Sequence, residues 1–265
     1  MDLGLRDSVC IVTGASRGIG LATAQRLCGE GARVLLSARG EQGLAAAAAT
    51  CAEAGGEVDH LALDVTAADA GVRLAARCAE RFGAPEVLVN NAGTSAVRPL
   101  GELTDDEWQA QWELNVMAPL RLMRAATPAM VERRYGRVVN VSSSSGKRPS
   151  ASNAAYSVAK SAQLALSRVW ADALAGSGVL VNAVTPGPIE TPLWLGEGGL
   201  AEQSAAAAGG SREDALSSAA AKLPLGRFGT PDEVAAVIVF LCSAAAGNVA
   251  GASWSVDGGA VPFFV

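Results

Sequence analysis

Two side chains able to exchange protons stand four residues apart near the middle of the chain. Tyr156 and Lys160 lie in a stretch whose composition predicts a helix, on which residues four apart share one face. An ammonium about 4 Å from a phenol, at an effective dielectric of about 20, contributes about 4 kcal/mol. That is enough to lower the phenol pKa from its ordinary ~10 by about 3 units. The pair therefore predicts an acid/base tyrosine that Lys160 biases toward its anion, although a surface helix with a solvated lysine remains the alternative.

A serine precedes this pair at the end of an apolar segment. Ser143 stands thirteen residues before Tyr156 and starts an S-x-x-G run after the predicted strand 137–141. A buried strand delivers the residue that follows it to one edge of its sheet, where ligands of open α/β sheets bind. We therefore expect the Ser143 hydroxyl to lie where a ligand bound at this edge would meet it. Ser145 lies in the same run and is expected to be a secondary substrate contact.

A glycine-rich turn follows the first predicted strand, 9–13. Residues 14–20 read G-A-S-R-G-I-G and run into a helical stretch that ends near residue 29. Glycine permits a sharp turn and a close approach of phosphates, and the helix N-terminus offers free N–H groups and a positive dipole end. The pattern favours a pyrophosphate-binding turn. Its expected cofactor contacts are Gly14, Ser16, Arg17, Gly18, Ile19 and Gly20.

The end of the second predicted strand, 33–37, bears on the choice of dinucleotide. A carboxylate about 20 residues past the glycines would hold the 2′-hydroxyl of NAD, and here the chain reads Ser37-Ala38-Arg39. Nothing there repels a 2′-phosphate, and Arg39 together with Arg17 could pair with one. NADP(H) is therefore favoured over NAD(H). A solvated surface charge is the alternative for either arginine.

Taken together, these motifs resemble the short-chain dehydrogenase/reductase family, and the likeness covers the chain from Val9 to Gly259. It rests on T-G-A-S-R-G-I-G, on N-N-A-G at 90–93, on the Ser143, Tyr156 and Lys160 spacing, and on P-G at 186–187. The broad pattern is similar to 3-oxoacyl-[acyl-carrier-protein] reductase-like members. The resemblance implies a fourth catalytic residue, Asn115, at a helix distortion, where it would hold a water in line with the lysine.

The remaining cofactor contacts are also implied by the resemblance. Asp64 would accept a hydrogen bond from the adenine amino group, although an N-cap for a helix near 67–82 explains it as well. Small residues after the fourth strand would admit the ribose, and Asn91 fits a sheet-stabilising role equally. The segment after the strand 180–184 would bend under the nicotinamide. The contacts implied are Asp64, Val65, Asn91, Ala92, Gly93, Pro186, Gly187, Ile189 and Thr191, together with Tyr156 and Lys160.

Strands and helices alternate through seven units, which predicts a single α/β domain over residues 1–265. We expect a Rossmann-type doubly wound sheet of about seven mostly parallel strands with helices on both faces. The predicted strands are 9–13, 33–37, 58–63, 87–89, 137–141, 180–184 and 253–256. The Gly/Ala-rich segment 192–222, with weak helical character, is expected to be a substrate lid with Leu193 and Trp194 at its hinge. A disordered insertion is the alternative.

Composition argues against several other classes of protein. Net charge is −5 with scattered cations, so no footprint for nucleic acid or membrane is expected. Arg133, Arg134 and Arg137 could receive an acidic carrier protein, but a solvated helix end explains them better. Without an apolar run of about 18 residues or a signal peptide, we expect a cytoplasmic protein. The five cysteines are expected to be buried and reduced, and the lone His60 to be an ordinary strand residue, so no metal site is expected.

We therefore expect an NADP(H)-dependent interconversion of a carbonyl and a secondary alcohol, with Tyr156 as acid/base and a 3-oxoacyl thioester or related ketone as substrate. One alternative is an alcohol, sugar or steroid dehydrogenase working oxidatively. Another is a catalytically silent cofactor-binding sensor, although such proteins usually lack the tyrosine or the lysine. An apolar tail, 260–265, contains Phe263 and Phe264 and favours a subunit contact. The family resemblance implies a homotetramer.

Overall fold

Seven parallel strands form one sheet, in the order β3-β2-β1-β4-β5-β6-β7. The computed structural model describes residues 2–262. All six neighbouring pairs of strands are parallel, which confirms the expected fold class. The strands are β1 Val9–Thr13, β2 Arg33–Ala38, β3 Glu57–Ala62, β4 Val87–Asn90, β5 Gly136–Val141, β6 Val179–Pro186 and β7 Ser253–Val256.

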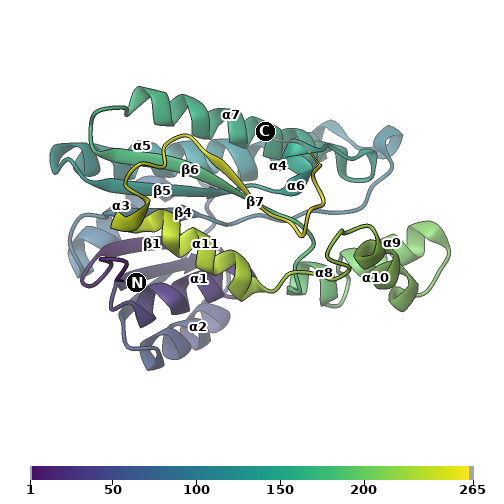
Figure 1. Ribbon diagram of the computed structural model, residues 1–265, viewed down its shortest axis with the longest axis horizontal. Helices are drawn as coiled ribbons and strands as arrows, with labels where there is room; N and C mark the ends of the chain where they lie inside the picture. The colour runs from purple at the N-terminus through teal and green to yellow at the C-terminus, as the bar shows by residue number, and fades with distance from the viewer. Residues whose placement is uncertain (1, 263–265) are drawn as a thin grey trace.

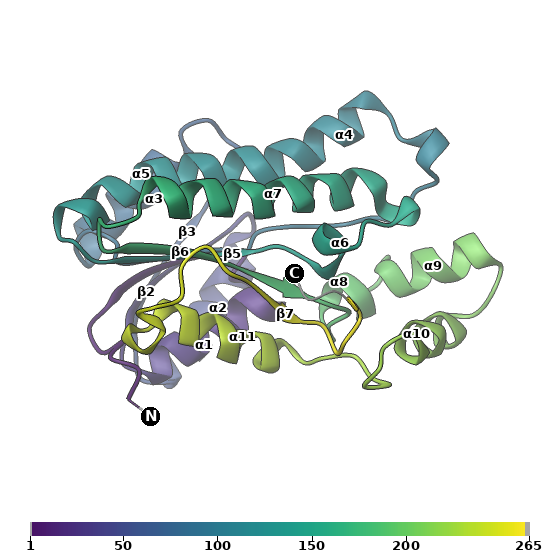
Figure 2. The same ribbon diagram turned by 45° about the horizontal axis from the view of Figure 1, so that its top comes forward.

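Helices cover both faces of the sheet (Figures 1 and 2). One face is covered by α1 Gly18–Gly29, α2 Glu41–Glu53 and α11 Pro231–Cys242. The other is covered by α3 Ala70–Arg81, α5 Ala118–Glu132 and α7 Ala154–Ala173, with α4 Asp105–Trp112 beside α7. Short elements complete the chain: η1 Leu100–Glu102, η2 Glu113–Met117, α6 Ser144–Lys147, η3 Ala151–Asn153 and η4 Ala244–Ala246.

The central strand shows why the sheet is buried on both sides. Every residue of β1 is buried, and alternate side chains enter different cores. Cys10 and Val12 pack with α1, α2 and α11, whereas Val9 and Ile11 pack with α3 and α5. The strand order reverses between β1 and β4, so the carboxyl ends of these strands open a crevice of the kind that binds ligands in open α/β sheets.

The first helix after β3 begins later than its sequence pattern predicts. Asp64 accepts hydrogen bonds from the backbone N–H and the hydroxyl of Thr66, at 2.9 and 2.7 Å. The Ala67 N–H donates to the Asp64 carbonyl, which closes a turn before the helix. Helix α3 then begins at Ala70, with Asp69 in the N-cap position. The expectation that Asp64 caps a helix at 67–82 is therefore wrong; it closes a separate turn instead.

The segment expected to be a weakly helical lid is built from three helices, α8 Pro192–Leu195, α9 Leu200–Ala208 and α10 Arg212–Ala221. Gly209, at φ 68°, ends α9 in the left-handed conformation that glycine adopts freely. Ser211 and Asp214 form a reciprocal capping box that opens α10. These helices lie beyond the carboxyl ends of the strands (Figure 1). The alternative of a disordered insertion is therefore wrong.

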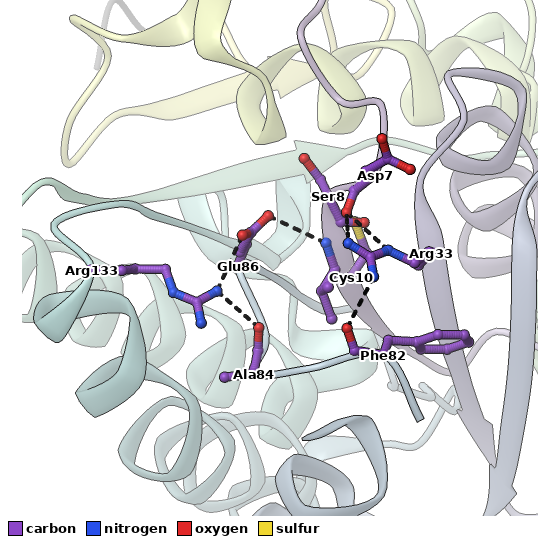
Figure 3. A network of polar contacts seen from close by, with 9 residues as sticks. Asp7, Ser8, Cys10, Arg33, Phe82, Ala84, Glu86 and Arg133 are labelled. Carbon is purple, nitrogen blue, oxygen red and sulfur yellow. Dashed lines mark hydrogen bonds and ion pairs between the residues drawn. The ribbon is translucent and has the colours of Figure 1, made fainter. Parts of the chain in front are cut away.

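The opposite edge of the sheet is held by a polar network (Figure 3). The Arg33 guanidinium donates to the Asp7 carbonyl at 2.6 and 3.1 Å and to the Phe82 carbonyl at 3.2 Å. Glu86 accepts from the first backbone amide of β1 and pairs with Arg133 at 3.1 Å. This network joins the amino-terminal ends of β1, β2 and β4, far from the crevice, so its role is structural.

Candidate active site

Three of the four residues expected to be catalytic lie together beyond the carboxyl end of β5. Ser143 follows that strand and caps α6, its hydroxyl accepting a hydrogen bond from the Ser145 amide at 3.1 Å. Tyr156 lies in the first turn of α7, and its side chain interacts with the Ser143 hydroxyl. Lys160 is one turn further along, with its Nζ 5.7 Å from the centre of the Tyr156 ring. The serine, phenol and amine therefore share one place in the fold.

Burial shapes the electrostatics of this group. Lys160 is 2% exposed, and burial lowers its pKa to about 7. Burial also raises the pKa of the Tyr156 phenol, and its interaction with Ser143 acts in the opposite direction with smaller effect. In this geometry desolvation outweighs the interaction with Ser143, so the pKa of the phenol lies above its ordinary value. The role of Lys160 in holding Tyr156 toward its anion stays a prediction. The Lys160 amine is directed instead to the Val141 carbonyl, at 2.7 Å.

Asn115 lies where the regular helix breaks. Helix α4 passes into a π-helical turn, η2, before α5 continues, which is the distortion expected at this residue. Its Nδ2 donates to the backbone and side-chain oxygens of Gln111, at 3.0 and 2.8 Å. Asn115 is fully buried, and its Oδ1 has no hydrogen-bond partner within residues 2–262. An ideal Cβ on Gly93 would lie 3.5 Å from this Oδ1 and 3.6 Å from Lys160 Nζ, so both groups face the same small space.

The glycine turn after β1 fits a dinucleotide. Gly14 has φ 64°, and an added Cβ would lie 2.9 Å from the Ala92 backbone. A Cβ on Gly20 would overlap Gly14 O and the Asn91 side chain. No side chain caps the start of α1, and no acidic residue stands in its first turn. These backbone amides and the dipole end are therefore open to the pyrophosphate of a nicotinamide dinucleotide, with Ser16, Arg17, Gly18 and Ile19 in the same turn.

The expected adenosine contacts surround the end of β2. Arg17 and Arg39 are exposed, and neither makes an ion pair within residues 2–262. Hydrogen bonds from Thr66 lower the pKa of Asp64, and the charge of Arg39 adds a smaller effect. Asp64 is exposed and Val65 is buried beside it. Arg39 therefore lies close enough to Asp64 for its charge to act on that carboxylate.

The Asn91 side chain bonds to protein backbone instead of pointing outward. Its Nδ2 donates to the carbonyls of Thr13 and Gly14 at 2.9 and 3.2 Å, joining the N-N-A-G segment to the glycine turn. The Thr13 hydroxyl, which the sequence reading missed, accepts from the amides of Asn91 and Ala92 at 3.0 and 3.1 Å. The sheet-stabilising alternative for Asn91 describes what the structure shows, and Ala92 and Gly93 continue along the crevice.

The segment after β6 closes against the same turn. A Cβ on Gly18 would lie 3.2 Å from the Thr191 side chain, which places the two segments in contact. The Thr191 hydroxyl donates to the Ile189 carbonyl at 3.3 Å, and both residues are buried. A Cβ on Gly187 would lie 2.9 Å from the Asp257 backbone, so the segment after β6 packs closely against the segment after β7. The expected nicotinamide contacts, with Pro186 at the end of β6, thus adjoin the glycine turn.

A cleft of about 860 Å³ lies between the loop after Ser143 and the helices α9 and α10. Ser145 and Trp194 line it, as expected, whereas Leu193 does not. The Trp194 ring packs edge-on against Phe228, with ring centres 5.0 Å apart. Much of the wall is hydroxyl-bearing or charged: Ser144, Ser145, Ser150, Ser152, Ser204, Ser211, Ser218, Arg148, Asp214 and Lys222.

Comparison with known proteins decides the family. A family model described as enoyl-(acyl carrier protein) reductase matches residues 14–261. The short-chain reductase protein NovJ of Streptomyces niveus is 37% identical over 254 residues, covering 96% of this chain and 94% of its own length. This chain belongs to the short-chain dehydrogenase/reductase family. It is therefore an oxidoreductase of that family, and its broad pattern is 3-oxoacyl-acyl-carrier-protein reductase-like.

Two further proteins that are similar to this short-chain reductase are named for different substrates. The 3-oxoacyl-[acyl-carrier-protein] reductase FabG of Thermotoga maritima is 35% identical, over 97% of this chain and 99% of its own. The structure of L-sorbose reductase from Gluconobacter frateurii, complexed with NADPH and L-sorbose, superposes with a TM-score of 0.93. That protein is 34% identical, and the match covers 100% of both chains.

Gln163, on α7, is a buried polar residue near the catalytic group that the sequence motifs did not indicate. Gln163 is 1% exposed on α7, and its Oε1 accepts a hydrogen bond from Lys160 Nζ at 3.1 Å. The sequence signal for it is its spacing, because a residue three positions after Lys160 shares its helix face.

The cysteines and the single histidine lie outside this group. The five cysteines are free and buried, and His60 lies in β3 with its ring 2.8 Å from Glu41. Within residues 2–262, no group of three metal-ligating side chains gathers, and no helix is long and apolar enough to span a membrane.

Proposed function

We propose that this short-chain reductase interconverts a carbonyl and a secondary alcohol, using NADP(H) and Tyr156 as the acid/base group. The observation that carries the proposal is the meeting of Ser143, Tyr156 and Lys160 beyond the carboxyl end of β5, in the same crevice region as the uncapped start of α1. When bound, the nicotinamide supplies or accepts the hydride, and the protein contributes position and charge.

The side chains divide the remaining work. Ser143 would donate a hydrogen bond to the carbonyl oxygen, and Tyr156 would give that oxygen its proton. Because burial raises its pKa, the phenol is held in the protonated form that reduction requires. Lys160 would hold the ribose hydroxyls. Asn115 would tether the water that resupplies the proton, a role supported by its buried Oδ1 without a protein partner.

NADP(H) is the proposed cofactor in preference to NAD(H). Arg17 and Arg39 are exposed cations without a carboxylate partner within residues 2–262, and Ala38 leaves no acidic side chain at the end of β2. A 2′-phosphate would therefore meet positive charge and no repulsion. The L-sorbose reductase whose structure this chain matches was complexed with NADPH, which supports the same choice.

A 3-oxoacyl thioester or a related ketone is the first proposed substrate class, supported by the likeness to FabG of Thermotoga maritima. A polyhydroxylated carbonyl compound is the second, and the cleft favours it. Seven serines and the cations Arg148 and Lys222 line the walls, which suits a substrate that makes many hydrogen bonds. Helices α8 to α10 are the proposed lid over this cleft.

The arginines considered as a carrier-protein patch do not form one. Arg133 pairs with Glu86, and Arg137 is 6% exposed and donates to the Ser243 carbonyl at 3.2 Å. Arg137 is the second residue of β5 and Arg133 precedes that strand, so both lie at the amino-terminal edge of the sheet, whereas the cleft follows its carboxyl edge. A carrier protein would therefore need another surface, which weakens the thioester class relative to small ketones.

A homotetramer is proposed from two exposed features. Val158 and Val169 are exposed apolar side chains on α7, and Trp112 is exposed on α4, which packs beside α7. Strand β7 ends the sheet, and an open edge readily pairs with another chain. The tail phenylalanines Phe263 and Phe264 lie outside the described residues. A cytoplasmic setting fits the five free thiols and is part of the proposal.

The test follows NADPH oxidation by the purified chain with three substrate sets: small ketones, polyhydroxylated ketones and 3-oxoacyl thioesters. Turnover that requires Tyr156 supports the proposed reaction, and the ranking of the sets assigns the substrate class. NADPH binding without turnover of any set, in either direction, would identify a cofactor-binding sensor instead. Size-exclusion chromatography with light scattering on the same preparation measures the oligomeric state.

A further inference from the structure

Gln163 is a buried polar side chain that the mechanism above does not use. It lies on α7 one turn after Lys160, and its Oε1 is 3.1 Å from Lys160 Nζ. The other acceptor of that amine within residues 2–262 is the Val141 carbonyl, at 2.7 Å. Gln163 is therefore the one side chain in the described structure that accepts a hydrogen bond from the amine.

Within residues 2–262, no ionised partner stabilises the charge on Lys160. Burial alone lowers its pKa to about 7, without a contribution from any charged group. Helix α7 packs against α4, α6, β5, β6, η2 and η3. The ionisable side chains of α7 and these elements are Asp105, Asp106, Glu107, Glu113, Arg137, Lys147, Tyr156, Arg168 and Asp172. Of these, Glu113 pairs with Arg121, and Lys147 donates to the Ser253 carbonyl, so neither is available to the amine.

Stability alone does not explain a glutamine at this position. Its Nε2 is buried and has no hydrogen-bond partner among the described residues 2–262, which destabilises the folded state. Its backbone is held independently of the side chain, because Ser167 Oγ donates to the Gln163 carbonyl at 2.7 Å and Asn140 donates to Ser167 at 2.9 Å. An apolar side chain would fill the site without an orphaned amide. The hydrogen bond that Oε1 accepts from the Lys160 amine therefore explains the glutamine side chain.

We propose that Gln163 is a positioning residue that orients Lys160 and favours its cationic form beside Tyr156. The proposal rests on the proposed function, in which the lysine must be charged to hold the cofactor and support the phenol. A neutral amide oxygen stabilises an ammonium without neutralising it. An apolar residue at 163 removes that acceptor, and a carboxylate there strengthens it.

The experiment measures NADPH affinity and carbonyl reduction across pH for the wild type, Gln163→Met and Gln163→Glu. Both quantities should fall as pH rises through the pKa of Lys160. In Gln163→Met the midpoint of that fall should move down by about 1 pH unit, and in Gln163→Glu it should move up by about 1 unit. Methionine matches glutamine in length, so the cavity is filled and the melting temperature should not drop.

Ser167→Ala is the matched control, because it removes the hydrogen bond to the Gln163 backbone and leaves the side chain in place. It should lower the melting temperature and leave the pH midpoints unmoved. Midpoints that stay fixed in both Gln163 variants, while the wild type reduces carbonyls, would overturn the positioning role alone. Midpoints of NADPH binding that move in opposite directions, in a wild type that reduces nothing, would sustain the inference and overturn the proposed reaction.

Discussion

Lys160 Nζ lies 5.7 Å from the centre of the Tyr156 ring, one helical turn away, and is directed to the Val141 carbonyl. Both groups are buried in the same region, and burial acts on them in opposite directions: it raises the pKa of the phenol and lowers that of the amine. Each is thereby pushed toward its neutral form. The pair is accordingly set for a protonated tyrosine, which suits carbonyl reduction.

Tyr156→Phe should abolish turnover, with a loss of at least about 100-fold, because the phenol is the proposed proton donor. NADPH affinity should stay nearly unchanged, since the ring and its packing remain. Steady-state kinetics and fluorescence titration measure the two effects. Substantial turnover in this variant would remove the phenol from the mechanism.

Stability of the chain without cofactor should rise with pH between about 7 and 8.5. The unfolded chain keeps Lys160 protonated up to its ordinary pKa of 10.5, whereas the folded chain loses that proton near 7. The unfolded state thus binds more protons in this window, so the free energy of unfolding increases by up to about 1.4 kcal/mol per pH unit. Urea denaturation at several pH values measures the slope.

Lys160→Met is the control for this slope and should flatten it. The window stops below pH 9 because burial raises the pKa of Cys10, Cys78 and Cys242 above the ordinary thiol value, which reverses the trend at higher pH. A slope of equal size in Lys160→Met would show that another group titrates there.

Arg39→Asp should move the cofactor preference toward NAD(H), by about tenfold or more in the ratio of kcat/KM values. The change removes a cation and adds a carboxylate at the end of β2. There the carboxylate would accept a hydrogen bond from the 2′-hydroxyl of the adenosine ribose of NAD(H) and repel the 2′-phosphate of NADP(H). Kinetics with both dinucleotides give the ratio. Arg124→Ala is the control, since Arg124 is exposed on α5, away from the glycine turn. An unchanged ratio would place Arg39 away from the 2′-phosphate.

Gly20→Ala should destabilise the fold by about 1–3 kcal/mol and weaken NADPH binding, because the new Cβ overlaps Gly14 O and the Asn91 side chain. Gly29→Ala, at the other end of the same helix, meets nothing within 4 Å and should be neutral or stabilising by up to about 1 kcal/mol. Chemical denaturation and cofactor titration compare them. Equal behaviour of the two variants would show that the turn tolerates a side chain.

Arg33→Ala should lower the free energy of unfolding by about 1–3 kcal/mol, because it leaves the Asp7 and Phe82 carbonyls without their donor. Turnover by the folded variant and its NADPH affinity should match those of the wild type, since the network of Figure 3 lies at the amino-terminal ends of the strands and the cleft follows their carboxyl ends. A fall in cofactor affinity without loss of stability would contradict this division between the two edges.

The strands could be predicted because each is a short, continuous apolar run, and burial on both faces demands such runs. β1, at 9–13, and β7, at 253–256, match their predicted bounds, and the others differ by one or two residues at one or both ends. Helices α4 and α11 each begin with a capping box, Thr104 with Glu107 and Thr230 with Glu233, whose threonine-to-glutamate spacing is a local pattern in the sequence. Helix α3 was misplaced because the Asp64 turn with Thr66 competes with a cap, and the pattern does not show which one forms.

Within the site, the spacing of Tyr156 and Lys160 fixed their shared helix face, since one turn of helix is local geometry. The pKa directions required the fold, because desolvation depends on which distant segments cover a group. The same holds for the bonds of Lys160 to Val141 and Gln163, and for Asn91 joining two strand ends. The sequence by itself determined the family, the sheet and the chemistry-bearing residues, because these follow from patterns local in the chain. Only the tertiary structure decided the charge states, the polar wall of the cleft and the partner of the active-site lysine, because those depend on contacts between segments remote in sequence.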